Sequence, residues 1–269
     1  MNMRRTAVEV FLIVVLLVTV LVGAGMYVLR TPQEHAAAPA VASEGAIEEK
    51  TDFYSISARY PAEVRDEGGA MRHFVEGIVA ARREEWKVGG EIQQSERELA
   101  AEYPDRPLPH YELTIRYEKY AAPALGFVTY AFEHYEYTGG AHGGTYLTTF
   151  SFGPSGLVSI ESLVDFNNGN DIALTRLLAE RLRTELGDMV DERMLAQGLG
   201  LAYLRPDGSF DSEACQCDGF FFPSNFQSFI VTDEGLRFIM QQYQVAPYAV
   251  GMPATTLTWT ELAPYLEPR

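Results

Sequence analysis

Alternation of apolar and polar side chains is clearest at residues 110–118. Tyr111, Leu113, Ile115 and Tyr117 fall on one face of an extended chain, with polar or charged residues between them, which predicts a half-buried antiparallel strand. Residues 127–132 and 145–152 are rich in aromatic and β-branched side chains and predict two further strands. Residues 54–60, which are followed by a proline, suit a first strand.

Helical periodicity appears in four stretches, at residues 67–86, 91–103, 171–186 and 188–197. The strongest is 171–186, where either Asn170 or Asp171 can cap the helix and leucines recur on one face. Residues 226–231 and 236–241 predict a hairpin around the turn at 232–235, and residues 255–259 predict another strand. Helices that precede runs of strands, without βαβ alternation, predict an α+β fold of antiparallel sheets with packed helices.

The N-terminus indicates an exported protein. Residues 10–29 are uncharged and apolar, long enough to cross a bilayer as a helix. Arg4 and Arg5 precede them, so residues 1–9 are expected to be a short cytoplasmic tail and the remainder to lie outside the cytoplasm. A signal peptide cleaved near Ala24 is the alternative. Residues 31–50 are expected to be a linker, with the folded part beginning near Thr51.

The charge of the chain is strongly acidic, with 21 basic and 37 acidic side chains and a formal net charge of −16. Such a balance disfavours nucleic acids and anionic membrane surfaces as partners and favours a basic partner. Solubility alone is the competing explanation. The two cysteines, Cys215 and Cys217, stand in a Cys-Gln-Cys sequence. In an exported domain they form either a local disulfide or two free thiols, and a zinc site is not expected.

The most distinctive loop candidate is the glycine-rich stretch at residues 137–144, which holds four glycines and one histidine between two predicted strands. Glycine is needed where the backbone takes positive φ or approaches another group closely. His134 and His142 lie on either side of the turn and suggest a metal site or a catalytic base, but the ligand density is low. The preferred interpretation is that His142 hydrogen-bonds the loop backbone, and no metal or cofactor is expected. The common hydrolase, nucleotide-binding and metalloprotease motifs are missing from the sequence.

Three segments of the sequence, residues 135–143, 229–236 and 243–251, together resemble the exported domain of RsiV-type anti-sigma factors, which also accompanies the deacetylase of PdaC-type proteins. Most members are catalogued as a domain of unknown function with a companion domain upstream. The resemblance implies a companion-like part at residues 51–160 and an RsiV-like part at residues 161–266. It also implies a domain of the bacterial cell envelope that binds lysozyme in RsiV-type members. The short N-terminal tail and the lack of room after residue 266 make sigma-factor regulation and deacetylation doubtful.

The leading hypothesis is therefore a single-pass, membrane-anchored binding module facing the periplasm or the cell exterior. Its expected partner is a lysozyme-like protein or a peptidoglycan fragment. The alternatives are a cell-wall hydrolase or deacetylase-associated enzyme that uses His142, and a purely structural envelope protein. The expected contact surface consists of residues in two loops: Tyr137, Gly139, Gly140, His142, Gly143, Pro247, Tyr248 and Gly251.

Overall fold

The computed structural model describes residues 44–267. The tail at 1–9, the apolar run at 10–29 and most of the expected linker lie outside the described residues. Within the part of the chain that is described, no helix has both the length and the apolar character needed to cross a membrane.

A six-stranded sheet forms the first half of the described chain, in the spatial order β1-β2-β3-β4-β5-β6. Its strands are β1 (Gly45–Lys50), β2 (Tyr54–Tyr60), β3 (Tyr111–Ala122), β4 (Phe127–Tyr137), β5 (Gly144–Gly153) and β6 (Gly156–Val158). All neighbours are antiparallel except β2 and β3, which are parallel. A parallel pair needs a long crossover, and here the chain makes it through α2 (Ala70–Glu85) and α3 (Glu91–Glu102).

Strand β1 corrects the expected domain boundary. It lies inside residues 31–50, which were predicted to be a linker, so the sheet begins before Thr51 and β2 is its second strand. The polar sequence of β1 hides this role, because residues 48–50 are Glu-Glu-Lys. Charged side chains are common on edge strands, where they discourage pairing with other molecules.

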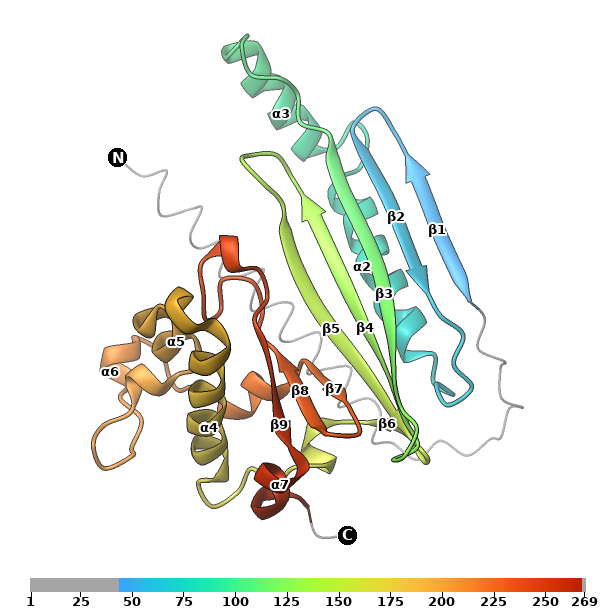
Figure 1. Ribbon diagram of the computed structural model, residues 1–269. Coiled ribbons are helices and arrows are strands. Elements are labelled where there is room, and N and C mark those ends of the chain that lie inside the picture. Colours follow the sequence, from blue (N-terminus) through green and yellow to red (C-terminus); the bar gives the residue numbers. More distant parts are fainter. Residues whose placement is uncertain (1–43, 268–269) are drawn as a thin grey trace. The chain divides into compact units, whose positions relative to one another are not determined.

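Helix α2 covers one face of the sheet and buries Met71, Val75 and Val79 (Figure 1). Its first turn is capped from outside the helix, because the Asp66 carboxylate accepts hydrogen bonds from Ala70 N (2.7 Å) and Met71 N (3.1 Å). The core beneath it is largely aromatic, and Phe132 and Trp86 are fully buried in it. Helix α3 lies at the end of the sheet where β4 passes into the glycine-rich loop.

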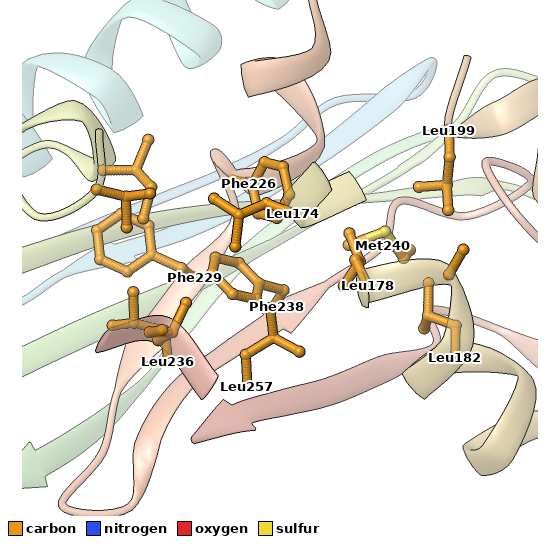
Figure 2. Packing of buried hydrophobic residues seen from close by; sticks show 14 of the residues in the cluster. Leu174, Leu178, Leu182, Leu199, Phe226, Phe229, Leu236, Phe238, Met240 and Leu257 are labelled. Atoms are coloured by element: carbon orange, nitrogen blue, oxygen red, sulfur yellow. The ribbon is translucent and has the colours of Figure 1, made fainter. Parts of the chain in front are cut away.

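The second half of the chain packs helices against a three-stranded antiparallel sheet of β7 (Phe229–Val231), β8 (Gly235–Ile239) and β9 (Ala254–Thr258). Helix α4 (Asn170–Leu186) lies on this sheet, and its leucines meet Phe238 and Leu257 in the core shown in Figure 2. The remaining helices are short: α5 (Glu192–Gly198), α6 (Ser212–Cys215) and α7 (Trp259–Leu262).

The sequence located these C-terminal elements well, with two differences. The hairpin, the last strand and helix α4 are confirmed. However, the N-cap residue of α4 is Gly169, one position before Asn170, and the Asp171 carboxylate accepts a hydrogen bond from Ile172 N (2.8 Å) inside the first turn. The helix expected at 188–197 is interrupted and restarts at Asp191, whose carboxylate accepts hydrogen bonds from Arg193 N and Met194 N.

The two sheets are joined through hydroxyl groups. Thr129 on β4 and Ser151 on β5 are buried and lie 2.9 Å apart (Oγ1 to Oγ). The Thr129 hydroxyl also accepts a hydrogen bond from Val231 N on β7 (3.3 Å), and the Thr149 hydroxyl accepts one from Phe229 N (3.1 Å). Buried polar groups are tolerated only when they are paired, so these hydroxyls fix where β7 meets the large sheet. The fold is α+β with antiparallel pairing dominant, as predicted.

Candidate functional site

The glycine-rich loop joins β4 to β5, and its glycines serve two different purposes. Gly139 and Gly140 have φ of 86° and 101°, a region that residues with a side chain rarely adopt. Gly143 instead makes room, because a Cβ there would lie 2.5 Å from the Tyr135 ring and 2.6 Å from Glu136 O. Tyr137 closes the turn by donating its hydroxyl to Gly140 O (3.1 Å). The loop therefore has a defined backbone path.

His142 sits on Tyr248, a residue that is 106 positions further along the chain. Their rings stack with centroids 4.0 Å apart and an interplanar angle of 24°. The Tyr243 ring lies 5.6 Å from that of Tyr248, and its hydroxyl is 3.4 Å from His142 Nε2. We call His142, Tyr243 and Tyr248 the aromatic cluster. Tyr243 and Tyr248 keep 52% and 37% of their surface exposed, so the cluster faces solvent.

The structure thus brings together the two loops that the sequence singled out. Pro247 and Gly251 frame Tyr248: Val250 N donates to Pro247 O (2.9 Å), Gly251 N donates to Tyr248 O (3.0 Å), and Gly251 has a φ of 78°. Tyr243 was not among the expected contact residues. Its φ of 66° is rare for a residue with a side chain, but nothing in the sequence marks that conformation.

Three glutamines that the sequence analysis also missed hold the second loop in place. The Gln241 amide accepts a hydrogen bond from Leu147 N (2.9 Å) and donates to Leu147 O (2.8 Å). Gln242 Oε1 accepts from Thr145 N (3.1 Å), and Gln244 Oε1 accepts from Gln241 N (2.9 Å). Side-chain amides therefore occupy the backbone groups that β5 would offer to another strand, and they seat residues 241–251 against the sheet.

The two histidines that suggested a metal site have separate partners. His142 Nδ1 lies 3.0 Å from Gly143 O, in agreement with the interpretation that it fixes the loop. His134 Nε2 lies 3.3 Å from Glu136 Oε2, and Arg82 Nε is 2.6 Å from Glu136 Oε1. Among residues 44–267 no group of three or more acidic, histidine or cysteine side chains is placed to hold a metal ion.

Glu136 is the ionised centre of that second group. Burial would raise the pKa of its carboxyl, but the hydrogen bond from His134 and the charge and hydrogen bond of Arg82 outweigh burial and lower it. The anion therefore persists at neutral pH and links the end of β4 to helix α2 directly beside the glycine-rich loop.

A shallow hollow of about 320 Å³ lies elsewhere, on β1, β2 and β3. Its lining includes Glu48, Ser57 and Glu112 together with apolar side chains such as Leu113. None of the residues of the aromatic cluster lines it. The partly exposed rings of the cluster instead offer stacking and hydrogen bonding, which are the interactions of recognition.

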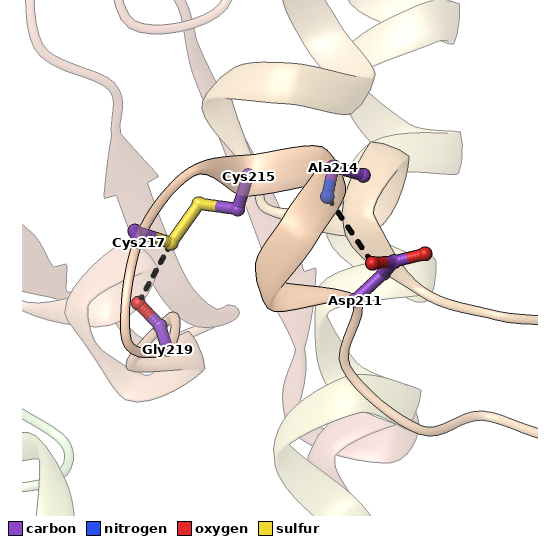
Figure 3. Close-up of a disulfide and its surroundings, with 5 residues drawn as sticks. All are labelled: Asp211, Ala214, Cys215, Cys217 and Gly219. Atoms are coloured by element: carbon purple, nitrogen blue, oxygen red, sulfur yellow. Dashed lines mark hydrogen bonds between the residues drawn. A yellow bond between two sulfur atoms is a disulfide. The ribbon is translucent and has the colours of Figure 1, made fainter.

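The cysteine pair, which the sequence left open, is a disulfide between Cys215 and Cys217 with the Cα atoms 5.2 Å apart (Figure 3). It lies at the end of α6, whose first turn is capped by Asp211 Oδ1, the acceptor for Ala214 N (3.1 Å).

Comparison with known proteins finds a match to a family model over part of the chain. A crystal structure of a DUF3298 family member from Bacteroides fragilis matches with a TM-score of 0.54 and 17% identity, over 84% of this chain and 93% of the other. A DUF3298 family protein from Pseudomonas aeruginosa gives a TM-score of 0.46 and 14% identity, over 84% of this chain and 94% of the other. The search of curated proteins finds no match. The fold is thus shared with the Bacteroides fragilis protein, and residues 166–260, which include Tyr243 and Tyr248, match the family described as Protein of unknown function (DUF3298).

Proposed function

We propose that the chain is an extracytoplasmic binding module of the cell envelope, and that the aromatic cluster with the glycine-rich loop is its contact surface. The first candidate partner is a basic protein of the lysozyme type, and the second is a peptidoglycan fragment. The observation that carries the proposal is the stack of His142 on Tyr248 at the solvent-facing junction of two shaped loops.

The composition around the cluster supports a protein contact. Residues 137–160 and 238–260 contain no aspartate, glutamate, lysine or arginine, although 22% of the whole chain is charged. Centres of protein interfaces are depleted of charge and enriched in tyrosine. Tyrosines held in place by packing bind at low entropic cost, and the glutamine contacts to β5 supply that rigidity.

The charge of the chain and its N-terminus support the kind of partner and its location. A net charge of −16 steers basic proteins toward the surface. The three segments that resemble RsiV-type domains favour a lysozyme-like enzyme in particular. The apolar run at residues 10–29 would hold the module at the membrane, with the folded part outside the cytoplasm.

Direct binding tests the proposal. The full-length chain, reconstituted in lipid nanodiscs, is titrated with lysozymes of several types and, separately, with muropeptides. Tyr248→Ala and Tyr243→Ala should each weaken binding by about tenfold to a hundredfold, because buried aromatic anchors dominate interfaces. Tyr103→Ala is the matched control, since Tyr103 is 55% exposed and lies outside the cluster. Failure of both ligand classes to bind at low salt contradicts the proposal, as does an equal loss in the Tyr103 variant.

A further inference from the structure

The loop that contains Cys215 and Cys217 has a backbone that its disulfide holds in an unusual conformation. Cys215 ends helix α6, and the next residue, Gln216, has φ 56° and ψ 39°. Only glycine visits this left-handed region without penalty. Cys217 N then donates to Ser212 O (3.3 Å), and the Cys217 sulfur is 3.3 Å from Gly219 O (Figure 3).

The disulfide contributes little to holding the fold together. It spans two sequence positions, and a disulfide stabilises a protein chiefly by closing a long loop in the unfolded chain. A bond across one intervening residue removes little unfolded-state entropy. Because the bond does not link distant segments, stabilisation of the fold does not by itself explain why it is present.

The bond is also open to attack. Both cysteines are half-buried and do not belong to either hydrophobic core, while Gln216, Asp218 and Gly219 beside them are exposed. Phe221, four residues after Cys217, is 65% exposed and offers an apolar contact next to the sulfurs. Accessible disulfides are the ones that exchange with external thiols.

The surroundings of the disulfide are acidic. Residues 206–228 include Asp207, Asp211, Glu213 and Asp218 and no lysine, arginine or histidine. Arg205 is the basic side chain that pairs with Asp211, at 3.2 Å. Because the attacking species in exchange is a thiolate, this field repels a thiol that carries further negative charge and attracts one that carries positive charge.

We infer that Cys215–Cys217 is a thiol–disulfide exchange site whose co-reactant is an uncharged or basic dithiol protein. A partner thiolate attacks one of the two sulfurs, the Cys215–Cys217 bond breaks, and a mixed disulfide forms while the released cysteine takes up a proton. The partner's second thiolate then attacks the mixed disulfide and releases the other cysteine, which is also protonated. The net reaction moves two electrons and two protons to the cysteine pair and leaves a disulfide in the partner. This site is independent of the binding surface proposed above.

Reduction has a structural consequence in the same loop. Without the bond, Gln216 is free to leave the left-handed region, and residues 216–221, with Phe221, lose the restraint that sets their path. The oxidised and reduced forms therefore present different surfaces at this point of the chain.

Reduction kinetics test the inference on the oxidised full-length chain. Three thiols serve as probes: cysteamine (cationic), 2-mercaptoethanol (neutral) and 2-mercaptoethanesulfonate (anionic). Reactions are quenched with acid and followed by mass spectrometry after alkylation. The reduction rate of the folded chain should lie within about tenfold of that of the urea-unfolded chain. A folded chain that is reduced more than about a hundredfold more slowly contradicts the inference, because the bond is then shielded by the fold.

The same data test the nature of the co-reactant. Each rate is divided by that thiol's rate with a neutral small-molecule disulfide. The relative rate should then be highest for cysteamine, lower for 2-mercaptoethanol and lowest for 2-mercaptoethanesulfonate, and added salt should reduce the differences between the three rates. The double variant Glu213→Gln/Asp218→Asn changes only exposed carboxylates and should also reduce the differences between the three relative rates. Equal relative rates for the three thiols, or differences that neither salt nor the variant reduces, would overturn the preference for a basic partner.

Discussion

The glycine-rich loop and the cysteine loop each present aromatic side chains to solvent, but they are held by opposite means. His142 and Tyr248 meet across 106 positions of sequence, and glutamine side chains bound to β5 position Tyr248. Phe221 follows a bond that spans two positions, in a loop whose exposed residues include Glu213 and Asp218. The conformation of the glycine-rich loop therefore depends on the whole fold, whereas that of the cysteine loop is set by contacts within the loop. Substitutions that disturb the tertiary structure should change the conformation of the glycine-rich loop. Breaking the Cys215–Cys217 disulfide should leave the global stability nearly unchanged.

The largest effect is expected for Gly198→Ala. A Cβ at this position would lie 1.6 Å from Gln244 O, so the segment that carries Tyr248 must move away from the core. We expect a loss of about 4 kcal/mol or more in the free energy of unfolding, measured by urea denaturation. Gly219→Ala in the cysteine loop is the matched control, because a Cβ there meets no atom within 4 Å. Equal losses in the two variants would show that the loops do not differ in their dependence on the fold.

The next effect is expected for Gln241→Ala. This change leaves Leu147 N and O without their side-chain partner and removes a bond from Gln241 Nε2 to Ser228 Oγ (2.9 Å). The expected destabilisation is about 2–3 kcal/mol, since backbone groups of β5 lose their partners. The exposed Gln94, whose amide donates to Gly89 O (2.9 Å), provides the control variant Gln94→Ala. A Gln241 variant as stable as the control would mean that the amides do not hold the loop.

The sequence revealed the parts of this arrangement that depend on local patterns. The alternation around Leu113 and Ile115 located β3, the leucine spacing located α4, and the glycines of the loop indicated a shaped turn. It missed β1, because Glu48, Glu49 and Lys50 on an exposed edge carry no apolar alternation. It also missed Gln241 and Tyr243, because their roles come from contacts with residues about a hundred positions away. Such pairs have no periodic signal in a single sequence.

Low pH should destabilise the region of the glycine-rich loop through protonation of Glu136. The pKa of this carboxyl is lowered by His134 and Arg82 in spite of burial. Its stabilising contribution is therefore present above the unfolded-state pKa, roughly 4.3, and is lost as the pH falls through the lower pKa of the folded state. Urea denaturation between about pH 3 and pH 6 should show stability falling with acid in the wild type and a smaller dependence in Glu136→Gln.

The ion pair of Glu192 with Arg183 provides a control that shows whether the pH dependence arises from Glu136. Glu192 also has a lowered pKa, through its hydrogen bond to Arg183, but this pair lies at the surface, with 58% of the Glu192 side chain exposed. Glu192→Gln should leave the pH dependence of stability close to that of the wild type, because exposed ion pairs are screened by solvent. If the two variants flatten the curve equally, the acid response does not arise at the end of β4.

The smallest effect is expected for the double variant Cys215→Ser/Cys217→Ser. The disulfide closes a loop with one intervening residue, so its removal should lower the free energy of unfolding by less than about 2 kcal/mol. Hydrogen exchange should at the same time speed up at residues near Gln216, where the left-handed conformation loses its restraint, while the amides of β5 remain protected. A loss of several kcal/mol would place this disulfide among the elements that maintain the fold, and the contrast between the two loops would then disappear.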